Sequence, residues 1–126
     1  MTMDVGAWAD QFQLQPALRD HFAAVVESLP EAVRDELMGD SAFQVIDFDP
    51  GNGGYCVPMA VPVVGGGASR CVVFKRTLAK RPVAFIRYVI AHELAHAHLR
   101  NEGRWEGEDP EHAADALAAD WGWPRP

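Results

Sequence analysis

Long apolar runs and a targeting segment are both missing from this sequence of 126 residues. No apolar stretch approaches the roughly 18 residues that identify a membrane-spanning helix. Residues 1–6 do not show a basic region followed by an apolar one, which a secretory signal requires. These absences predict a cytoplasmic protein that has no membrane partner.

Basic residues are scarce as well. The chain has 11 Lys and Arg against 18 Asp and Glu, which gives a formal net charge of −7. Nucleic acids and anionic membranes select proteins with basic patches, because their phosphates attract lysine and arginine. The composition therefore argues against nucleic acid as the main partner.

Cysteine occurs only twice, as Cys56 and Cys71. Two cysteines are too few for a disulfide scaffold. Both fall in neighbouring predicted strands, so they could lie close together. Reduced, buried thiols are the favoured state in a cytoplasmic protein, and a disulfide or thiol regulation stays open as the alternative.

The length predicts a single domain over residues 1–126, large enough for a hydrophobic core. Residues 1–39 are expected to be helical. Residues 16–26 show apolar spacing near the helical repeat of about 3.6 residues, and a second short helix is expected from Pro30 through Met38. The predicted class is α+β, because strand patterns follow these helices.

Residues 42–76 predict a small three-stranded, mostly antiparallel sheet with glycine-rich turns between its strands. The expected strands are Phe43–Phe48, residues 55–64 and Arg70–Lys75. Pro58 and Pro62 cannot donate hydrogen bonds to a neighbouring strand. The middle strand is therefore expected at an edge of the sheet, or to be partly irregular.

The most informative motif is His92-Glu93-Leu94-Ala95-His96, an H-E-x-x-H sequence. Two histidines four residues apart lie on one face of a helix, so they can hold one divalent metal ion with the glutamate beside the open position. The surrounding residues 82–99 are largely apolar, and Pro82 suits a first helical position. Burying these polar groups unpaired costs several kcal/mol, and a metal ion would compensate that cost. Core histidines paired with carboxylates, without metal, are the alternative.

Residues 109–121 predict a second helix, with Asp109 as N-cap and Pro110 in its first turn. Glu111 and Asp115 are four residues apart and share a face. Catalytic zinc takes three protein ligands and one open position, and two histidines with one glutamate form a standard set. Glu111 is therefore the candidate third ligand. Asp115 is placed to accept the spare ring N–H of a ligating histidine.

Small residues occur on both predicted helices. Alanines would let the two backbones approach closely enough to share one ion. They are Ala91 and Ala95 on the first helix, and Ala113, Ala114 and Ala118 on the second.

H-E-x-x-H followed by a helix with E-x-x-x-D resembles the gluzincin metallopeptidases, the family of thermolysin. The form with Glu111, Ala114 and Asp115 also looks like the small intracellular ImmA/IrrE-type peptidases and the CAAX-prenyl-type membrane peptidases. The resemblance covers residues 82–122. It implies a minimal single-lobe zincin with N-terminal helices, a small sheet, an active-site helix and a C-terminal ligand helix.

The same resemblance implies one zinc ion per chain, held by His92, His96 and Glu111. Asp115 matches the aspartate that supports a ligating histidine. Glu93 matches the general base that acts with a zinc-activated water to hydrolyse a peptide bond in a specific protein substrate. A protein partner or a homodimer could complete the shallow cleft of a single lobe. The alternative is a zincin-derived binding or structural module without catalysis.

Other ligand assignments are less favourable. Metzincins continue the motif to a glycine and a third histidine, but Leu99 and Glu102 stand at those places. Glu102 is also expected in a helix end and loop. His98 follows the second motif histidine by two residues and points about 200° away around the helix. His112 lies about 100° from the third ligand candidate, which makes it a weaker choice.

Two further features stay open. Acyl transfer needs a donor to the developing oxyanion besides the metal; Tyr55, Tyr88, His112 and the arginines near the motifs are candidates. Residues 123–126 are expected to form a loose tail without an assigned role.

Overall fold

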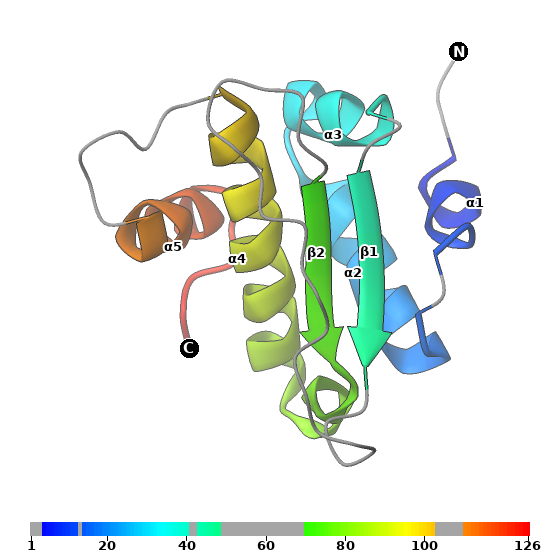
Figure 1. Cartoon of the computed structure of the whole chain (residues 1–126). Coiled ribbons are helices and arrows are strands. Elements are labelled where there is room, and N and C mark those ends of the chain that lie inside the picture. The colour runs from blue at the N-terminus through cyan, green and yellow to red at the C-terminus, as the bar shows by residue number, and fades with distance from the viewer. Residues whose placement is uncertain (1–3, 13, 41–42, 49–69, 103–109) are drawn as a thin grey trace.

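The computed structural model of the chain describes residues 4–12, 14–40, 43–48, 70–102 and 110–126. Helices dominate, and the mixture of helix and strand confirms the α+β class (Figure 1). The elements in chain order are α1 (Val5–Ala9), α2 (Pro16–Ser28), α3 (Glu31–Met38), β1 (Phe43–Phe48), β2 (Arg70–Lys75), the 3-10 helix η1 (Arg76–Lys80), α4 (Val83–Glu102) and α5 (Pro110–Asp120).

The two described strands run parallel, so the predicted antiparallel pairing is wrong. Phe43 pairs with Arg70 and Phe48 pairs with Lys75, which fixes the register of β1 on β2. The expected middle strand, residues 55–64, lies outside the described residues. Parallel neighbours need a connection of about a dozen residues or more, which returns the chain to the starting end of the first strand. The segment between Phe48 and Arg70 is long enough for such a connection.

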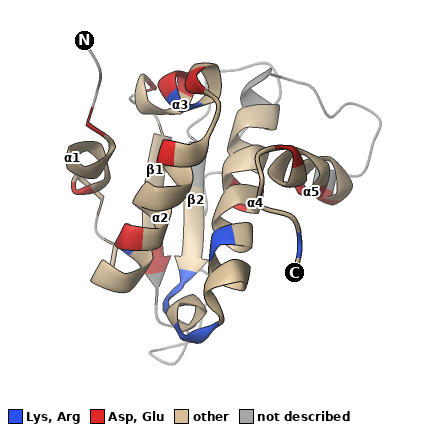
Figure 2. Cartoon of the chain, turned by 180° about the vertical axis from the view of Figure 1, so that it is seen from behind, with Lys and Arg blue, Asp and Glu red and all other residues tan. Residues whose placement is uncertain are grey.

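The N-terminal helices confirm the predicted periodicity. α2 starts at Pro16, where the missing N–H of proline costs no hydrogen bond, and α3 starts directly after Pro30. The buried residues of α2 recur at helical spacing: Leu18, Phe22, Ala23, Val25 and Val26. α2 lies against one face of the two strands in both views of the chain (Figures 1 and 2).

Four aromatic rings join the N-terminal helices to the sheet. Trp8 of α1 stacks on Phe22 of α2 and on Phe43 of β1, with centroid distances of 5.6 and 5.7 Å. Phe12 meets the Trp8 ring edge-on at 5.1 Å. Such pairs add to the stabilisation from burial alone, so this cluster fixes α1 and α2 on β1.

α4 is the helix that carries the H-E-x-x-H motif. It extends to Glu102, within the segment expected to form the helix end and loop. Ile90 and Leu94 are fully buried in the core, and His92 lies about 200° around the helix from Ile90. One face of α4 thus serves the core and the opposite face carries the histidines. No described helix, α4 included, is long and apolar enough to cross a membrane.

α5 packs on the side of α4 that faces away from the strands (Figure 1). Ala95 of α4 and Ala114 and Ala118 of α5 are fully buried. Side chains of this size keep the two helix backbones close. This close packing brings the first turn of α5 next to the motif histidines.

Charge is distributed unevenly over the described chain. Acidic side chains are spread over several helices, whereas basic ones gather around η1 at one end of the molecule (Figure 2). This basic group consists of Lys75, Arg76, Lys80 and Arg81.

Candidate metal centre

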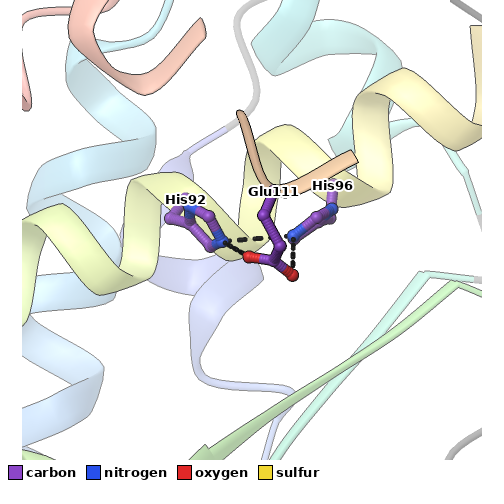
Figure 3. A group of neighbouring side chains, drawn as sticks. All are labelled: His92, His96 and Glu111. Carbon is purple, nitrogen blue, oxygen red and sulfur yellow. Dashed lines mark hydrogen bonds and ion pairs between the residues drawn. The ribbon is translucent and has the colours of Figure 1, made fainter. Parts of the chain in front are cut away.

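Three side chains converge between α4 and α5. His92 and His96 project from successive turns of α4, and Glu111 reaches them from the first turn of α5 (Figure 3). Their potential ligand atoms all lie within 4.8 Å of one another. The structure thus brings together the three residues predicted as metal ligands.

The contacts within the group are short. Glu111 Oε2 lies 2.8 Å from His92 Nε2, and Glu111 Oε1 lies 3.2 Å from His96 Nε2. The two Nε2 atoms are 3.1 Å apart. Zinc bonds of about 2.0–2.1 Å imply about 3.3–3.4 Å between the ligand atoms of a tetrahedron. Outward shifts of a few tenths of an ångström would therefore make room for an ion.

Asp115 lies behind His92, one turn of α5 beyond Glu111. Its Oδ1 is 2.8 Å from His92 Nδ1. The hydrogen bond from Tyr88 lowers the pKa of the Asp115 carboxyl below its ordinary value; the hydrogen bond from His92 acts in the same direction, and burial opposes both. An ionised carboxylate can only accept a hydrogen bond. His92 Nδ1 must therefore carry a hydrogen.

This tautomer has a direct consequence for the other ring nitrogen. When His92 is neutral with its hydrogen on Nδ1, Nε2 has only a lone pair to offer. That lone pair then faces a carboxylate oxygen of Glu111 and the Nε2 atom of His96. His92 Nε2 and Glu111 Oε2 are then two acceptors 2.8 Å apart, which repel one another unless a cation or a proton lies between them. The donor set fits a divalent metal ion; a second proton on His92, shared between two carboxylates, is the metal-free arrangement.

The group is open to solvent on the Glu111 side. The side chains of His92 and His96 are 10% and 14% exposed, whereas that of Glu111 is 69% exposed. The histidines are held firmly by the packing of α4, and the carboxylate lies at the surface. An ion held here would be accessible from solvent, as a catalytic site with one open position requires.

Glu93, the predicted general base, is half-buried on α4 between the two histidines. Its position lies about 100° around the helix from His92, and His96 falls between these two directions. Glu93 thus belongs to the same side of α4 as the ligand pair.

The less favoured histidines lie elsewhere. His98 Nδ1 contacts Glu36 of α3 at 2.9 Å, and its ring packs against Trp121. His112 is exposed on α5 and is not a member of the three-residue group. His21 accepts a hydrogen bond from Arg87 at 3.1 Å. None of these three shares in the candidate site.

Several predicted features fall where the structure does not describe them. Cys56 and Tyr55 lie outside the described residues, and so does the N-cap Asp109. Cys71 is in β2 and Glu102 ends α4, but their side chains are not described. A disulfide between the cysteines and a role for Glu102 as ligand therefore stay alternatives from the sequence alone.

Tyr88 and Arg125 contact the site in a role that the sequence analysis did not assign, since it considered Tyr88 only as an oxyanion donor. The Tyr88 hydroxyl donates to Asp115 Oδ1 at 2.5 Å, and Arg125 Nε donates to the same hydroxyl at 3.1 Å. Burial, with the Asp115 contact, raises the pKa of Tyr88, so the hydroxyl keeps its proton. That proton is engaged in the hydrogen bond to Asp115, so Tyr88 is no longer a candidate oxyanion donor. A signal for Tyr88 was its spacing, four residues before His92; nothing comparable marked Arg125.

Comparisons of the chain with protein-family models, with curated proteins and with solved structures gave no match. The function is therefore inferred from the residues of the site and their geometry.

Proposed function

We propose that the chain is a zinc-dependent metallopeptidase of the gluzincin type, in which His92, His96 and Glu111 hold one zinc ion and Glu93 is the general base. The observation that carries this proposal is the convergence of three potential ligand atoms, from His92, His96 and Glu111, within 4.8 Å of one another. The ionised Asp115 supports it, because it holds His92 in the tautomer that ligates through Nε2.

Zinc, when bound, supplies a Lewis acid and lowers the pKa of water to about 7. Glu93 would accept a proton from water as its oxygen bonds to the peptide carbonyl carbon. The same carboxyl would then donate this proton to the amine nitrogen as the C–N bond breaks. The proton count closes without any further reactant, and Glu93 returns to its ionised form.

A catalytic site is favoured over a structural one for two reasons. Structural zinc sites are closed by four protein ligands, and three donors gather here among the described residues. A structural site also has no use for a general base, yet Glu93 stands between the ligating histidines. Both features support hydrolysis over a purely structural role.

The substrate class follows from the exposure of the site. Glu111 is largely exposed, so the described residues enclose little of a bound peptide. A specific cytoplasmic protein substrate that supplies its own contacts suits such a site, and a partner protein or a second copy of the chain could provide the missing wall.

Metal content is the first test of the ligand set. Purified protein is dialysed and analysed by mass spectrometry for metals, next to Glu111→Ala. The control is Asp120→Ala, which removes an exposed acid at the other end of the same helix. One zinc ion per chain in the wild type and in the control, but not in Glu111→Ala, is expected. A wild type without zinc would leave the metal-free ion pairs as the explanation of the geometry.

Cleavage is the second test. The zinc-loaded protein is incubated with a peptide library and with a protein extract, and new N-termini are identified by mass spectrometry. Glu93→Gln should keep zinc and lose cleavage, whereas Glu27→Gln, an exposed glutamate of α2, should keep both. A wild type that holds zinc but gives no new termini would favour the non-catalytic module.

A further inference from the structure

The C-terminal residues do not form the loose tail expected from the sequence. α5 ends in a Schellman motif, in which Trp123 N–H donates to the carbonyl of Ala118 at 2.9 Å and Gly122 N–H to that of Ala119 at 3.0 Å. Gly122 adopts a φ of 98°, a conformation that side chains disfavour. This turn reverses the chain and directs it back toward α4.

Trp123 anchors the returning segment. Its indole Nε1 donates to the Ser28 hydroxyl at the end of α2, at 2.9 Å. The Arg87 guanidinium of α4 lies over the indole ring, 5.7 Å from its centroid. The segment is thus fixed to two helices, and Arg125, two residues later, is placed beside Tyr88.

Hydrogen-bond chemistry gives the contacts around Tyr88 one direction. Arginine can only donate, so the Tyr88 oxygen must accept from Arg125. The tyrosine proton is then directed to Asp115, which as a carboxylate can only accept. Asp115 in turn requires a hydrogen on Nδ1 of His92. The series of hydrogen bonds thus begins at Arg125, which can only donate, and runs through Tyr88 and Asp115 to His92. It fixes the hydrogen on Nδ1 of His92 and so leaves Nε2 free to bind a metal.

We propose that Tyr88 and Arg125 are positioning residues for His92: Arg125 orients the Tyr88 hydroxyl, and this hydroxyl holds Asp115 in the position that fixes the His92 tautomer. The proposal rests on the proposed metal site. Tyr88 also contacts His92 directly, with ring centroids 5.8 Å apart. Outer partners of this kind typically change metal affinity by about 10–100-fold.

The competing explanation is that Arg125 only holds the tail in place. Its side chain is 71% exposed and stacks on the Tyr88 ring at 5.6 Å. Its Nη2 also lies 3.7 Å from Asp115 Oδ2, a direct ion pair that does not involve the tyrosine hydroxyl. A packing role would act independently of the tyrosine hydroxyl. The two explanations thus differ in whether the effect of Arg125 on zinc binding becomes smaller when the hydroxyl is removed.

A double-mutant cycle separates them. Zinc dissociation constants are measured by chelator competition for the wild type, Tyr88→Phe, Arg125→Gln and the double variant. Tyr88→Phe keeps the ring and should weaken binding by about tenfold, and Arg125→Gln by a few-fold. In the Tyr88→Phe background, Arg125→Gln should cause a smaller loss than in the wild type, because only the ion pair of Arg125 with Asp115 is then left to remove. Additive losses, or no loss in either single variant, would overturn the proposal while leaving the metal site intact.

A second measurement does not need zinc. Nitrogen-15 NMR of the metal-free imidazoles reports which nitrogen of His92 carries the hydrogen, at one fixed pH. The wild type should show the Nδ1–H form, and both single variants a mixture of tautomers. An unchanged tautomer in both variants contradicts the proposal even if the wild type binds no zinc, so its failure is distinct from failure of the proposed function.

Arg81 offers a matched control. It lies over the Phe85 ring at 4.7 Å, near the start of α4, and so makes the same kind of arginine–aromatic contact as Arg125. Arg81→Gln should leave the zinc dissociation constant and the His92 tautomer unchanged. Arg125→Lys, which keeps a donor and the charge, should restore part of the affinity lost in Arg125→Gln.

Discussion

Asp115 Oδ1 lies 2.8 Å from His92 Nδ1, and this contact joins α5 to the motif helix on the side of the ring opposite to Nε2. Glu111 approaches Nε2 of the same ring from one turn earlier on α5. Side chains of one helix, α5, therefore contact both ring nitrogens of His92. The docking of α5 on α4 therefore determines both the candidate ligand set and the histidine tautomer.

Replacing Asp115 by Asn tests the importance of this contact. The amide can donate as well as accept, so it no longer requires a hydrogen on His92 Nδ1. We expect zinc affinity to fall by about 10–100-fold, measured by chelator competition. Asp120→Asn, the same change at an exposed position of α5, is the control. Equal affinities of Asp115→Asn and the wild type would show that the tautomer is set in another way.

The closeness of α4 and α5 can be tested at a buried alanine. Ala114 is fully buried, whereas Ala116 on the same helix is exposed. Ala114→Leu would push the helices apart, so we expect a loss of about 1–3 kcal/mol in the free energy of unfolding and weaker zinc binding. Denaturant unfolding and chelator competition measure the two effects.

Ala116→Leu adds the same volume without an overlapping neighbour helix and should change neither quantity appreciably. Similar zinc affinities of the two leucine variants would mean that the site does not depend on close approach of the helices.

The helices, and the side chains that each helix brings together, could be predicted from the sequence, because a helix places residues three or four apart on one face. Glu111 and Asp115 share a helix face for this reason, as do His92 and His96. The parallel pairing of β1 with β2 could not be predicted from the sequence. Strand direction depends on the connection between the strands, and the strand residues themselves do not determine it. Local patterns do not contain that information.

Tyr88 and Arg125 show the same limit within the site. Tyr88 has the correct spacing from His92, but its partner Asp115 lies on another helix. Arg125 reaches the hydroxyl only because Gly122 reverses the chain and Trp123 anchors it on α2. The turn at Gly122 is local, but the contacts of Trp123 with Ser28 and of Arg125 with Tyr88 join residues far apart in the sequence, which no short window of sequence reveals.

His98 and His96 should behave oppositely when replaced. His98 bonds Glu36 of α3 and lies outside the metal group, so His98→Ala should lower the free energy of unfolding by about 1–3 kcal/mol and keep zinc binding. His96→Ala should abolish tight zinc binding. Urea unfolding of the metal-free proteins and zinc titration separate the two effects. Loss of zinc from His98→Ala at a temperature where it stays folded would contradict this division of roles.

His21 gives the fold a dependence on pH that does not involve the metal group. Burial lowers the pKa of His21, the positive charge of Arg87 adds to this, and Asp20 opposes it. In the folded chain, Nδ1 accepts a hydrogen bond from Arg87, so the neutral ring is favoured. The unfolded chain binds a proton with a pKa of about 6.5. Below that pH the unfolded chain therefore binds more protons than the folded chain. The contribution of neutral His21 to the free energy of unfolding is then lost as the pH falls through the lower folded pKa.

Replacing His21 by Gln should remove this contribution, because the amide oxygen can accept from Arg87 but does not titrate. Unfolding by urea is measured for the metal-free proteins at about pH 7.5 and about pH 5.5, which bracket the ordinary histidine pKa. We expect a smaller loss of stability on acidification in His21→Gln than in the wild type. The other histidines contribute equally to both chains, so they cancel in the comparison. Equal losses in the two chains would mean that His21 has the same proton affinity folded and unfolded.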